Sequence, residues 1–175
     1  MKHSFLYAAL CLLFAANSLL AQANASASTT VTANLKKGLS ISQVGGGLSF
    51  GEIILTGSAT TPSIAPASGA SFKVIGHPNK NVTISYSSIT LSNNAWVTAT
   101  GGGTNDNMTF TPEVTHTGSS SSYAGASSIT SGNAYQLVNV SGDGNLYMWV
   151  GGEIGIGALQ AHGDYTGTFT VTVAY

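Results

Sequence analysis

The side chains best suited to bind a metal or to move a proton are three of the four histidines, His77, His116 and His162; the fourth, His3, lies at the start of the chain. No two of them are spaced i, i+2 or i, i+4, and no pattern of carboxylates accompanies them. A metal ion needs several such ligands to converge, so a site here would require three separate segments to meet. The spacing favours histidines at the surface and predicts no metal site.

Other residue types that carry chemistry lack the pattern that the chemistry needs. Asp106 in TNDN and Asp143 in GDGN lie in turn-like sequences without the dense acidic ligands of a calcium loop. No serine lies in G-x-S-x-G, and the stretch GEIGIGALQAHG lacks the G-x-G-x-x-G spacing of a nucleotide-binding turn. No pair of carboxylates suits glycoside hydrolysis. We therefore expect no catalytic residue, no cofactor and no enzyme activity.

Charged residues are scarce in this chain. Its 175 residues include 5 lysines and arginines and 6 aspartates and glutamates. All the cations are lysines, and arginine is the side chain best suited to bidentate contacts with phosphates and bases. We therefore expect no nucleic-acid partner. The abundant Gly, Ser, Thr and Asn, with β-branched and aromatic residues between them, favour short strands joined by turns.

The first residues have the pattern of an export signal. Lys2 and His3 precede the apolar stretch SFLYAALCLLFAANSLL, and the small-residue pattern AQA follows it. We predict a Sec signal peptide over residues 1–23, removed by cleavage after Ala23, with Ala25 as the alternative position. The protein is expected to reach the periplasm and then the cell surface.

The apolar stretch also bears on membrane spans and disulfides. It is short for a transmembrane helix, Asn17 interrupts it, and no later run is long enough to cross a membrane as a helix. Cys11 is the only cysteine and lies within the predicted signal peptide. The mature protein is therefore expected to have no disulfide, no zinc–thiolate site and no cysteine nucleophile.

Downstream, short alternating stretches separated by turn residues predict strands. SFKVIG and NVTISYSSITL are expected to pair as a hairpin around the tip HPNKN, and NNAWVTAT to add a short strand. AYQLVNVSGDGNLYMWV is expected to hold two strands around a tight turn at GDG. No helix longer than about one turn is expected. These signals predict an all-β fold, either an antiparallel sandwich or a small barrel.

The two ends of the mature chain show the most regular alternation. In residues 25–35 one parity is small or apolar and the other is Ser, Thr and Asn; the first consists of Ala25, Ala27, Thr29, Val31, Ala33 and Leu35. In residues 165–175 the apolar parity includes Tyr165, Phe169, Val171, Val173 and Tyr175. A period of two predicts two strands, each with one buried face.

Two interpretations of these terminal strands stay open. In the first, they are the ordinary first and last strands of a sandwich. In the second, residues 25–35 are a donor strand that fills a groove in the incomplete sandwich of the next subunit. Small alternate side chains suit a strand that enters pockets, and the last strand could supply the open edge beside it.

Several segments carry marks of a known family. They are TVTANLKKGLSISQVGGGLSFGEI, FKVIGHPNKNVTISY and LYMWVGGEIGIGALQAHGDYTGTFTVTVAY. The marks are Ser49-Phe50-Gly51, a hairpin entered through Gly76, a VGG strand at residues 150–152, and the ending G-x-Y-x-G-T-x-x-V-x-V-x-Y. On these marks the chain resembles the bacterial family known as domain of unknown function 4402. The resemblance covers nearly the whole mature chain, and the ending is its most specific part.

More distantly, the layout is similar to the spore-coat-U-type pilins of archaic chaperone–usher systems, which usually carry disulfides. This resemblance implies an immunoglobulin-like antiparallel sandwich completed by a donor strand, and a pilin-like fimbrial subunit of a surface fibre. Its partners would be neighbouring copies of itself, a periplasmic chaperone and an usher. Applied to this chain, the resemblance implies an N-terminal extension at residues 24–35, with the donor strand at 25–35, and a sandwich domain at 36–175. The chaperone would bind residues 165–175.

An outer-membrane β-barrel is a competing function class. Such barrels also end in alternating apolar residues and a terminal aromatic, which Phe169, Val171, Val173 and Tyr175 provide. A barrel needs many strands of about ten residues with an apolar outer band. The long Pro/Ser/Gly stretches of this chain fit that requirement poorly.

A self-contained secreted adhesin or carbohydrate-binding sandwich is a third class. Trp96, Tyr123 and Trp149 could stack on sugar rings, although such residues more often belong to a core or a strand edge. Trp149 alternates with Tyr147, which predicts that Trp149 is packed.

Overall fold

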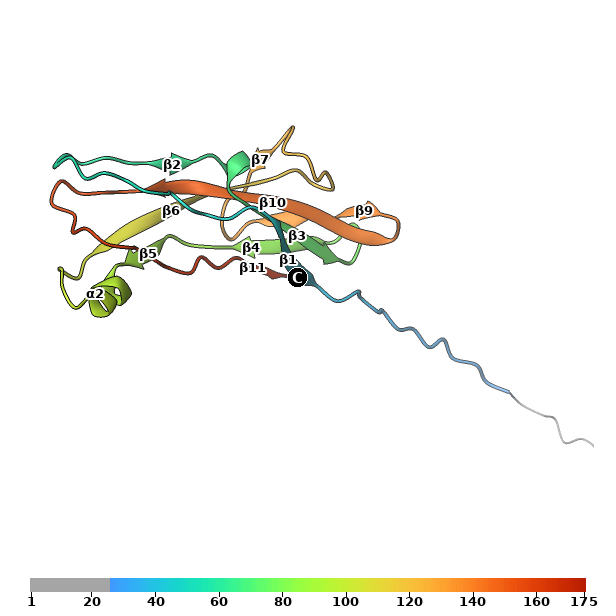
Figure 1. Cartoon of the computed structure of the whole chain (residues 1–175). Coiled ribbons are helices and arrows are strands. Elements are labelled where there is room, and N and C mark those ends of the chain that lie inside the picture. Colours follow the sequence, from blue (N-terminus) through green and yellow to red (C-terminus); the bar gives the residue numbers. More distant parts are fainter. Residues whose placement is uncertain (1–25) are drawn as a thin grey trace, which may run out of the picture. The chain divides into compact units, whose positions relative to one another are not determined.

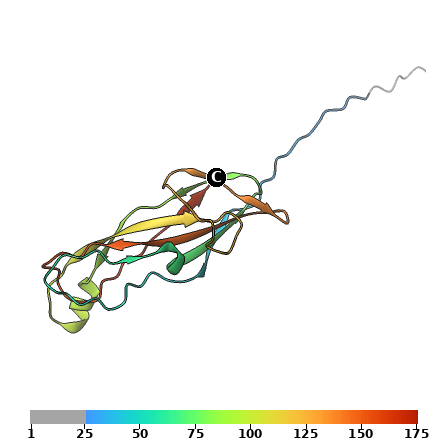
Figure 2. The same ribbon diagram turned by 90° about the horizontal axis from the view of Figure 1, so that it is seen from above.

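The computed structural model describes residues 26–175, and the chain divides between Leu35 and Lys36 into two units. The predicted signal peptide and Ala25 lie outside the described residues. The second unit, Lys36–Tyr175, forms two layers of antiparallel strands (Figure 1, Figure 2). These two sheets confirm the all-β sandwich that the sequence predicts.

The larger sheet is built around its longest strand, β10. Its main strands, in spatial order, are β1 (Ser40–Gly45), β3 (Ala70–Gly76), β10 (Asp143–Ile154), β6 (Asn107–His116) and β5 (Ile89–Ser92). Short strands add to it: β2 (Ser63–Ile64) and β9 (Val138–Val140) pair with β10, and β7 (Ser127–Ser128) pairs with β6. Every pairing is antiparallel.

The smaller sheet has three strands and ends on the last strand of the chain. Its order is β11 (Thr172–Ala174), β4 (Asn81–Ser85) and β8 (Ala134–Gln136). Val173 of β11 lies opposite Ile84 of β4. Within the described residues, β11 pairs with no strand on its other side. The smaller sheet therefore has an open edge along the end of the chain.

The alternation of β10 explains its central place in the core. Leu146, Met148 and Val150 are completely buried, whereas Tyr147 and Trp149 between them are half-buried on the opposite face. Burying a side chain of this size stabilises a fold by about 1.5–3 kcal/mol. The inward face of β10 thus anchors the layer that faces the smaller sheet.

The predicted hairpin between SFKVIG and NVTISY is wrong, because β3 and β4 lie in different sheets. β3 pairs with β1 and β10, whereas β4 pairs with β8 and β11. Residues 77–80 cross from one sheet to the other, and the Asn79 N–H donates to the carbonyl of Leu137 at 2.9 Å. Val74 of β3 and Val82 of β4 are buried in one core cluster. Alternation predicts the buried face correctly, but it does not identify the pairing partner.

The stretch NNAWVTAT, predicted as a strand, instead forms the helix α2 (Asn94–Thr100). Gly101 ends this helix with a left-handed φ of 69°, and its N–H donates to the carbonyl of Val97 at 3.1 Å. A glycine in this conformation is a common helix stop, and alanine favours a helix over a strand. With 7 residues, α2 also exceeds the expected limit of about one turn. A short 3-10 helix, η2 (Pro66–Ser68), precedes β3.

The hairpin expected around GDG is present as β9 and β10, but its turn lies at Ser141-Gly142, and Asp143 and Gly144 already belong to β10. Val140 lies opposite Asp143, and the two residues between them are Ser141 and Gly142. Both have positive φ angles, 53° and 89°. Two successive positive φ values are the pattern of the type I′ turn, whose twist matches that of a hairpin.

Residues 26–35 form neither a helix nor a strand, so the strand predicted over 25–35 is absent from them. A lone extended segment has no neighbour to complete its hydrogen-bond ladder, and its alternation alone does not produce a strand. Among residues 26–175, no helix is both long enough and apolar enough to cross a membrane.

Candidate functional site

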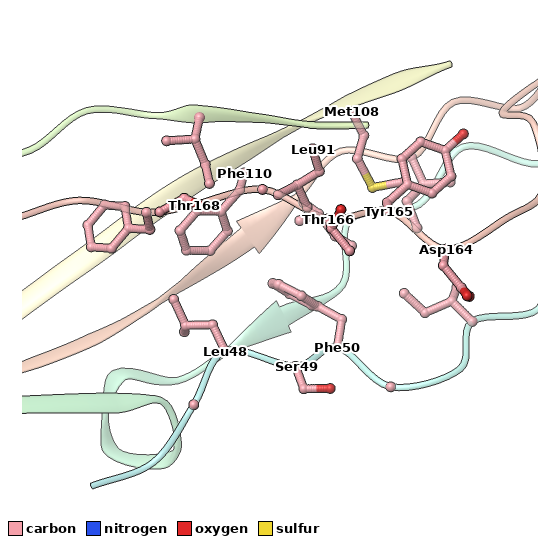
Figure 3. A pocket seen from close by; sticks show the side chains of 18 of the residues that line it. Leu48, Ser49, Phe50, Leu91, Met108, Phe110, Asp164, Tyr165, Thr166 and Thr168 are labelled. Carbon is pink, nitrogen blue, oxygen red and sulfur yellow. The ribbon is translucent and has the colours of Figure 1, made fainter. Parts of the chain in front are cut away.

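An apolar groove with a volume of about 790 Å³ opens into the sandwich between two stretches of the chain (Figure 3). We call residues 47–55 its first wall and residues 163–169 its second wall. Side chains of β5, β6 and the end of β10 form its floor. Ala70 and Phe72 of β3 line it as well, so the groove combines two walls with strands that are far apart in sequence.

The first wall is an extended stretch without strand partners. Leu48, Phe50 and Ile53 are half-buried and pack against the core cluster of Met108 and Phe110. In Figure 3 the side chains of Leu48 and Phe50 point towards the floor. Within the described residues, no backbone hydrogen bond joins residues 47–59 to another segment. The wall thus offers apolar side chains inward and unpaired backbone groups along its length.

The floor is centred on Phe110 of β6, which is only 2% exposed. Its ring meets Phe50 of the first wall at a centroid distance of 6.1 Å and Phe169 of the second wall at 5.9 Å, both edge-on. Edge-to-face pairs of this kind contribute about 0.5–1.5 kcal/mol beyond the area that they bury. Phe110 therefore holds both walls in place from below.

The second wall is the start of the predicted last strand, drawn in dark red in Figure 1. Tyr165, Phe169, Val171 and Val173 are half-buried and contact the core clusters, as the alternation predicts. The strand itself is shorter than predicted, because only Thr172–Ala174 are paired in a continuous ladder. Upstream, Thr166 forms an isolated bridge to Ser92, with both N–H···O distances at 3.0 Å.

On one side, the backbone of the last strand has no strand partner among the described residues. Ile84 of β4 exchanges hydrogen bonds with residues 132 and 133, away from β11. In an antiparallel ladder the hydrogen-bonding directions alternate, so Val173, which lies opposite Ile84, directs its N–H and C=O away from β4. The open edge of β11 therefore presents a backbone donor and acceptor to any strand beside it.

Gly167 lets the second wall lie close to β5. A Cβ at this position would be 2.7 Å from Leu91 Cδ2 and 2.8 Å from the carbonyl oxygen of Thr90. No side chain fits at these distances without moving the backbone. The glycine explains why the apolar parity of this stretch is interrupted between Tyr165 and Phe169.

Polar groups line the end of the groove next to the second wall, and they bind one another. Gln160 Nε2 donates to Asp106 Oδ2 at 2.7 Å and to Tyr165 Oη at 2.9 Å. The Tyr165 hydroxyl donates to the carbonyl of Ala161 at 2.8 Å, and the Ala161 N–H donates to Asp106 Oδ2 at 2.9 Å. The backbone N–H groups of Ala161 and Asn107 lower the pKa of Asp106, and burial raises the pKa of Tyr165. The network fixes the start of the second wall.

The other end of the last segment is held by a contact that we call the Tyr175 clasp. The Tyr175 hydroxyl donates to the carbonyl of Lys37 at 2.8 Å and accepts from the N–H of His77 at 2.7 Å. The Lys36 Nζ lies 5.9 Å from the centre of the Tyr175 ring. Lys37 also pairs with Asp143. The side chain of Tyr175 therefore joins the end of the last segment to the first residues of the sandwich.

The histidines do not form a shared site in residues 26–175, where no three His, Cys, Asp or Glu side chains gather as metal ligands. His77 belongs to the clasp, and His162 packs edge-on against Trp96 at 5.3 Å. His116 packs against Tyr135 at 5.2 Å, and burial lowers its pKa. Each histidine thus contacts a different part of the sandwich.

The aromatic residues considered for sugar binding also have separate surroundings. Trp149 is half-buried, and its Nε1 donates to Thr117 Oγ1 at 3.2 Å. Tyr123 packs edge-on against Trp149 at 5.5 Å, whereas Trp96 lies beside His162. Trp149 is packed, as its alternation with Tyr147 predicts, but on the face of β10 that points away from the core.

The candidate donor residues are accessible where the structure describes them. Val31 is 89% exposed and Leu35 is 82% exposed, and Ala27, Thr29 and Ala33 are exposed as well. Ala25 lies outside the described residues. The candidate residues of the last segment, in contrast, share one side of the sandwich and extend from the groove to the clasp.

Sequence reasoning did not assign the first wall or the floor to a site. The inward alternation of Leu48 and Phe50 was a usable signal, because it follows the turn at residues 45–47 without an obvious partner strand. The contribution of β5 and β6 has no local signal, since Leu91 and Phe110 have the pattern of ordinary core residues. Only the folded structure shows that Leu91 and Phe110 lie at the floor of the groove.

Comparison with known proteins gives a family and no named relative. No curated protein and no solved structure matches this chain. The more distant similarity to spore-coat-U-type pilins stays a prediction. The family described as domain of unknown function (DUF4402) matches residues 31–175, which include Val31, Leu35, both walls of the groove and the clasp, and the chain therefore belongs to this family.

Proposed function

We propose that this protein is a non-catalytic structural subunit whose groove binds an extended strand from a neighbouring copy, so that copies join into a fibre outside the cell. The observation that carries the proposal is an apolar groove whose first wall has no strand partner and whose second wall continues into the open edge of β11. Residues 47–59 make no backbone hydrogen bonds to other described segments, and Val173 directs its backbone groups away from β4. An added strand would bond to both edges while its side chains cover the floor.

A strand suits this groove better than a small molecule does. Small-molecule sites combine an apolar lining with a few free polar groups that orient the ligand. Here Gln160, Asp106 and Tyr165 are bonded to one another at 2.7–2.9 Å, and their polar atoms are already engaged. Other polar side chains of the lining, such as Ser49, Asp164 and Thr168, are exposed, and the first wall adds a row of unpaired backbone groups. The natural partner of these backbone groups is the backbone of another strand.

The leading segment of a second copy has the properties that such a strand needs. Val31 and Leu35 are almost fully exposed, so burying them would remove apolar surface from water. Residues 24–35 contain no charged side chain, so their burial leaves no ion without a partner. The Ser, Thr and Asn residues of the other parity would face solvent.

The proposal includes a route to the cell surface. Residues 1–23 would direct export through the Sec pathway and be removed, which frees the leading segment in the periplasm. A chaperone would protect the apolar parity of residues 165–175 until a second copy replaces it, because an open sheet edge invites unwanted pairing. An usher would then bring the copies together at the outer membrane.

The proposal is tested with a sandwich that lacks the leading segment. We would produce residues 36–175 and add a synthetic peptide of residues 26–35, and measure binding by calorimetry and the shift of the melting temperature. A ligand that binds only the folded state raises its stability by about 2.7 kcal/mol at a concentration one hundred times its Kd. We expect a saturable shift with one peptide per domain.

The matched control is a peptide of the same composition in which each apolar residue is moved by one position. A one-residue slip exchanges the two faces of a strand, so this peptide should not stabilise the domain. The full chain from residue 24 should form ladders or filaments, whereas residues 36–175 alone should not. A full chain that stays monomeric at high concentration, together with a domain that ignores the peptide, would rule the proposal out.

A further inference from the structure

The groove ends before it reaches the Tyr175 clasp. The lining of the groove includes residues 163–169 but none of residues 170–175, and it includes residues 47–55 but none of residues 36–42. At the excluded end, Leu39 and Val173 already pack against the core, and Tyr175 bonds to Lys37. The interior is thus filled towards the clasp and empty towards residue 163.

The last segment and β1 both connect the clasp with the walls of the groove, and they run in opposite directions. The last segment runs from Tyr165, beside the empty part of the groove, to Tyr175 at the clasp. β1 starts with Ser40 opposite Ile75 and ends with Gly45 opposite Ser71, so it runs away from the clasp towards the first wall. Figure 1 shows β1 beginning beside the C-terminus. The leading segment is joined to Lys36, so its point of connection to the sandwich lies at the clasp.

Resting on the function proposed above, we infer that the clasp keeps the chain's own leading segment out of its groove. The groove then receives the leading segment of a second copy, with its free N-terminus towards the clasp. To fill its own groove, a chain would have to turn back at Lys36 and pass the place where Tyr175 bonds to Lys37. A second copy has no such obstacle. Its strand would lie antiparallel to residues 165–175.

The sizes of the donor side chains agree with this direction. Val31 and Leu35, the large residues of the inward parity, lie near the end of the segment, whereas Ala27 and Thr29 precede them. In the antiparallel direction the large side chains meet the empty part of the groove, and the small ones meet the filled part near the clasp. The parallel direction, which the chain's own segment would have to adopt, places Leu35 where Val173 and Leu39 already occupy the interior.

The direction can be measured with engineered disulfides, because the only cysteine of the chain, Cys11, lies in the predicted signal peptide. In the full mature chain, a cysteine is placed at Thr32 or at Ser28, on the outward parity of the donor. Each is combined in turn with a cysteine at an outward position of the last segment, namely Thr166, Thr168, Thr170 or Thr172. After mild oxidation, gels under non-reducing conditions separate cross-links within one chain from cross-links between chains.

We expect cross-links between chains, with a partner position that moves towards Thr172 when the cysteine moves from Thr32 to Ser28. This shift identifies the direction whatever the register. The opposite result would be cross-links within one chain, with a partner position that moves towards Thr166 when the cysteine moves from Thr32 to Ser28. It would overturn the inference, although the groove would still bind a strand. If no combination cross-links and the domain of residues 36–175 also ignores the peptide, the function itself fails, and the inference fails with it.

The role of the clasp is measured separately with Tyr175→Phe, which keeps the ring and removes the hydroxyl. Each of the two lost hydrogen bonds corresponds to roughly a two- to tenfold change in an equilibrium constant, so the ratio of cross-links within one chain to those between chains should rise by about fourfold to 100-fold. Tyr147→Phe, which removes a tyrosine hydroxyl on the outward face of β10 and outside the lining of the groove, serves as the control. Melting curves establish that each variant is folded. An unchanged ratio in folded Tyr175→Phe would show that the clasp does not exclude the chain's own segment.

Discussion

Shortening Val31 and Leu35 to alanine should prevent assembly without weakening the sandwich. Both side chains are more than four-fifths exposed in the single chain, so their removal costs the sandwich almost nothing. In the groove of a second copy they would be buried. Val→Ala and Leu→Ala remove two and three carbons, and at about 0.8 kcal/mol for each buried carbon the double variant loses about 4 kcal/mol of binding free energy. This corresponds to roughly a thousandfold weaker association.

Sedimentation or light scattering would measure assembly as a function of concentration, and chemical denaturation would measure the free energy of unfolding of residues 36–175 and of the full chain. The control is Thr30→Ala combined with Thr32→Ala, which shortens the opposite parity and should leave assembly within about threefold of normal, as surface substitutions usually do. A double alanine variant of Val31 and Leu35 that assembles like the unaltered chain would refute the assignment of these residues to the groove.

Four further predictions concern the walls, the floor and the response to pH. Gly167→Ala should destabilise the sandwich by about 1–3 kcal/mol, because its Cβ would lie 2.8 Å from a backbone oxygen, whereas Gly155→Ala, which has open space around it, should not; denaturant titration compares the two. Phe110→Ala should cost about 3–5 kcal/mol and lower the affinity for the donor peptide, because it removes the ring between both walls. Burial lowers the pKa of His116 in the folded state, so stability should fall as the pH drops below the ordinary histidine pKa of about 6.5, and His116→Gln should remove this dependence in melting curves. Backbone donors lower the pKa of Asp106, so a second loss of stability should follow below about pH 4, and Asp106→Asn should remove that one.

The sequence alone predicts the fold class and the faces of the strands, because a period of two is a local property. Leu146, Met148 and Val150 are buried as their alternation predicts. On the inward parity of the last segment, Phe169, Val171 and Val173 are half-buried, whereas Tyr175 is 48% exposed. Pairing is not local. The tip HPNKN suits a hairpin as well as a crossing between sheets, and the crossing is observed because β3 and β4 bury their inward faces in the same core from opposite layers.

The groove lies beyond sequence reasoning for the same reason. Its walls are separated by more than one hundred residues, and its floor residues have the pattern of an ordinary core. The terminal tyrosine is a partial exception. An aromatic residue at the end of an alternating segment predicts a contact that keeps the end from fraying, but only the structure identifies Lys37 and His77 as its partners.

The lengths of the groove and of the donor segment also agree. The second wall of the groove, residues 163–169, would face a donor strand of about seven residues, because two paired strands both advance by about 3.3 Å per residue. A stretch of that length that ends at Leu35 contains both large donor side chains, and the family match also begins at Val31. The groove and the side chains that suit it therefore lie together in the part of the chain shared with the family. The small residues before Val31 are left to the filled end of the groove, where little room remains for larger ones.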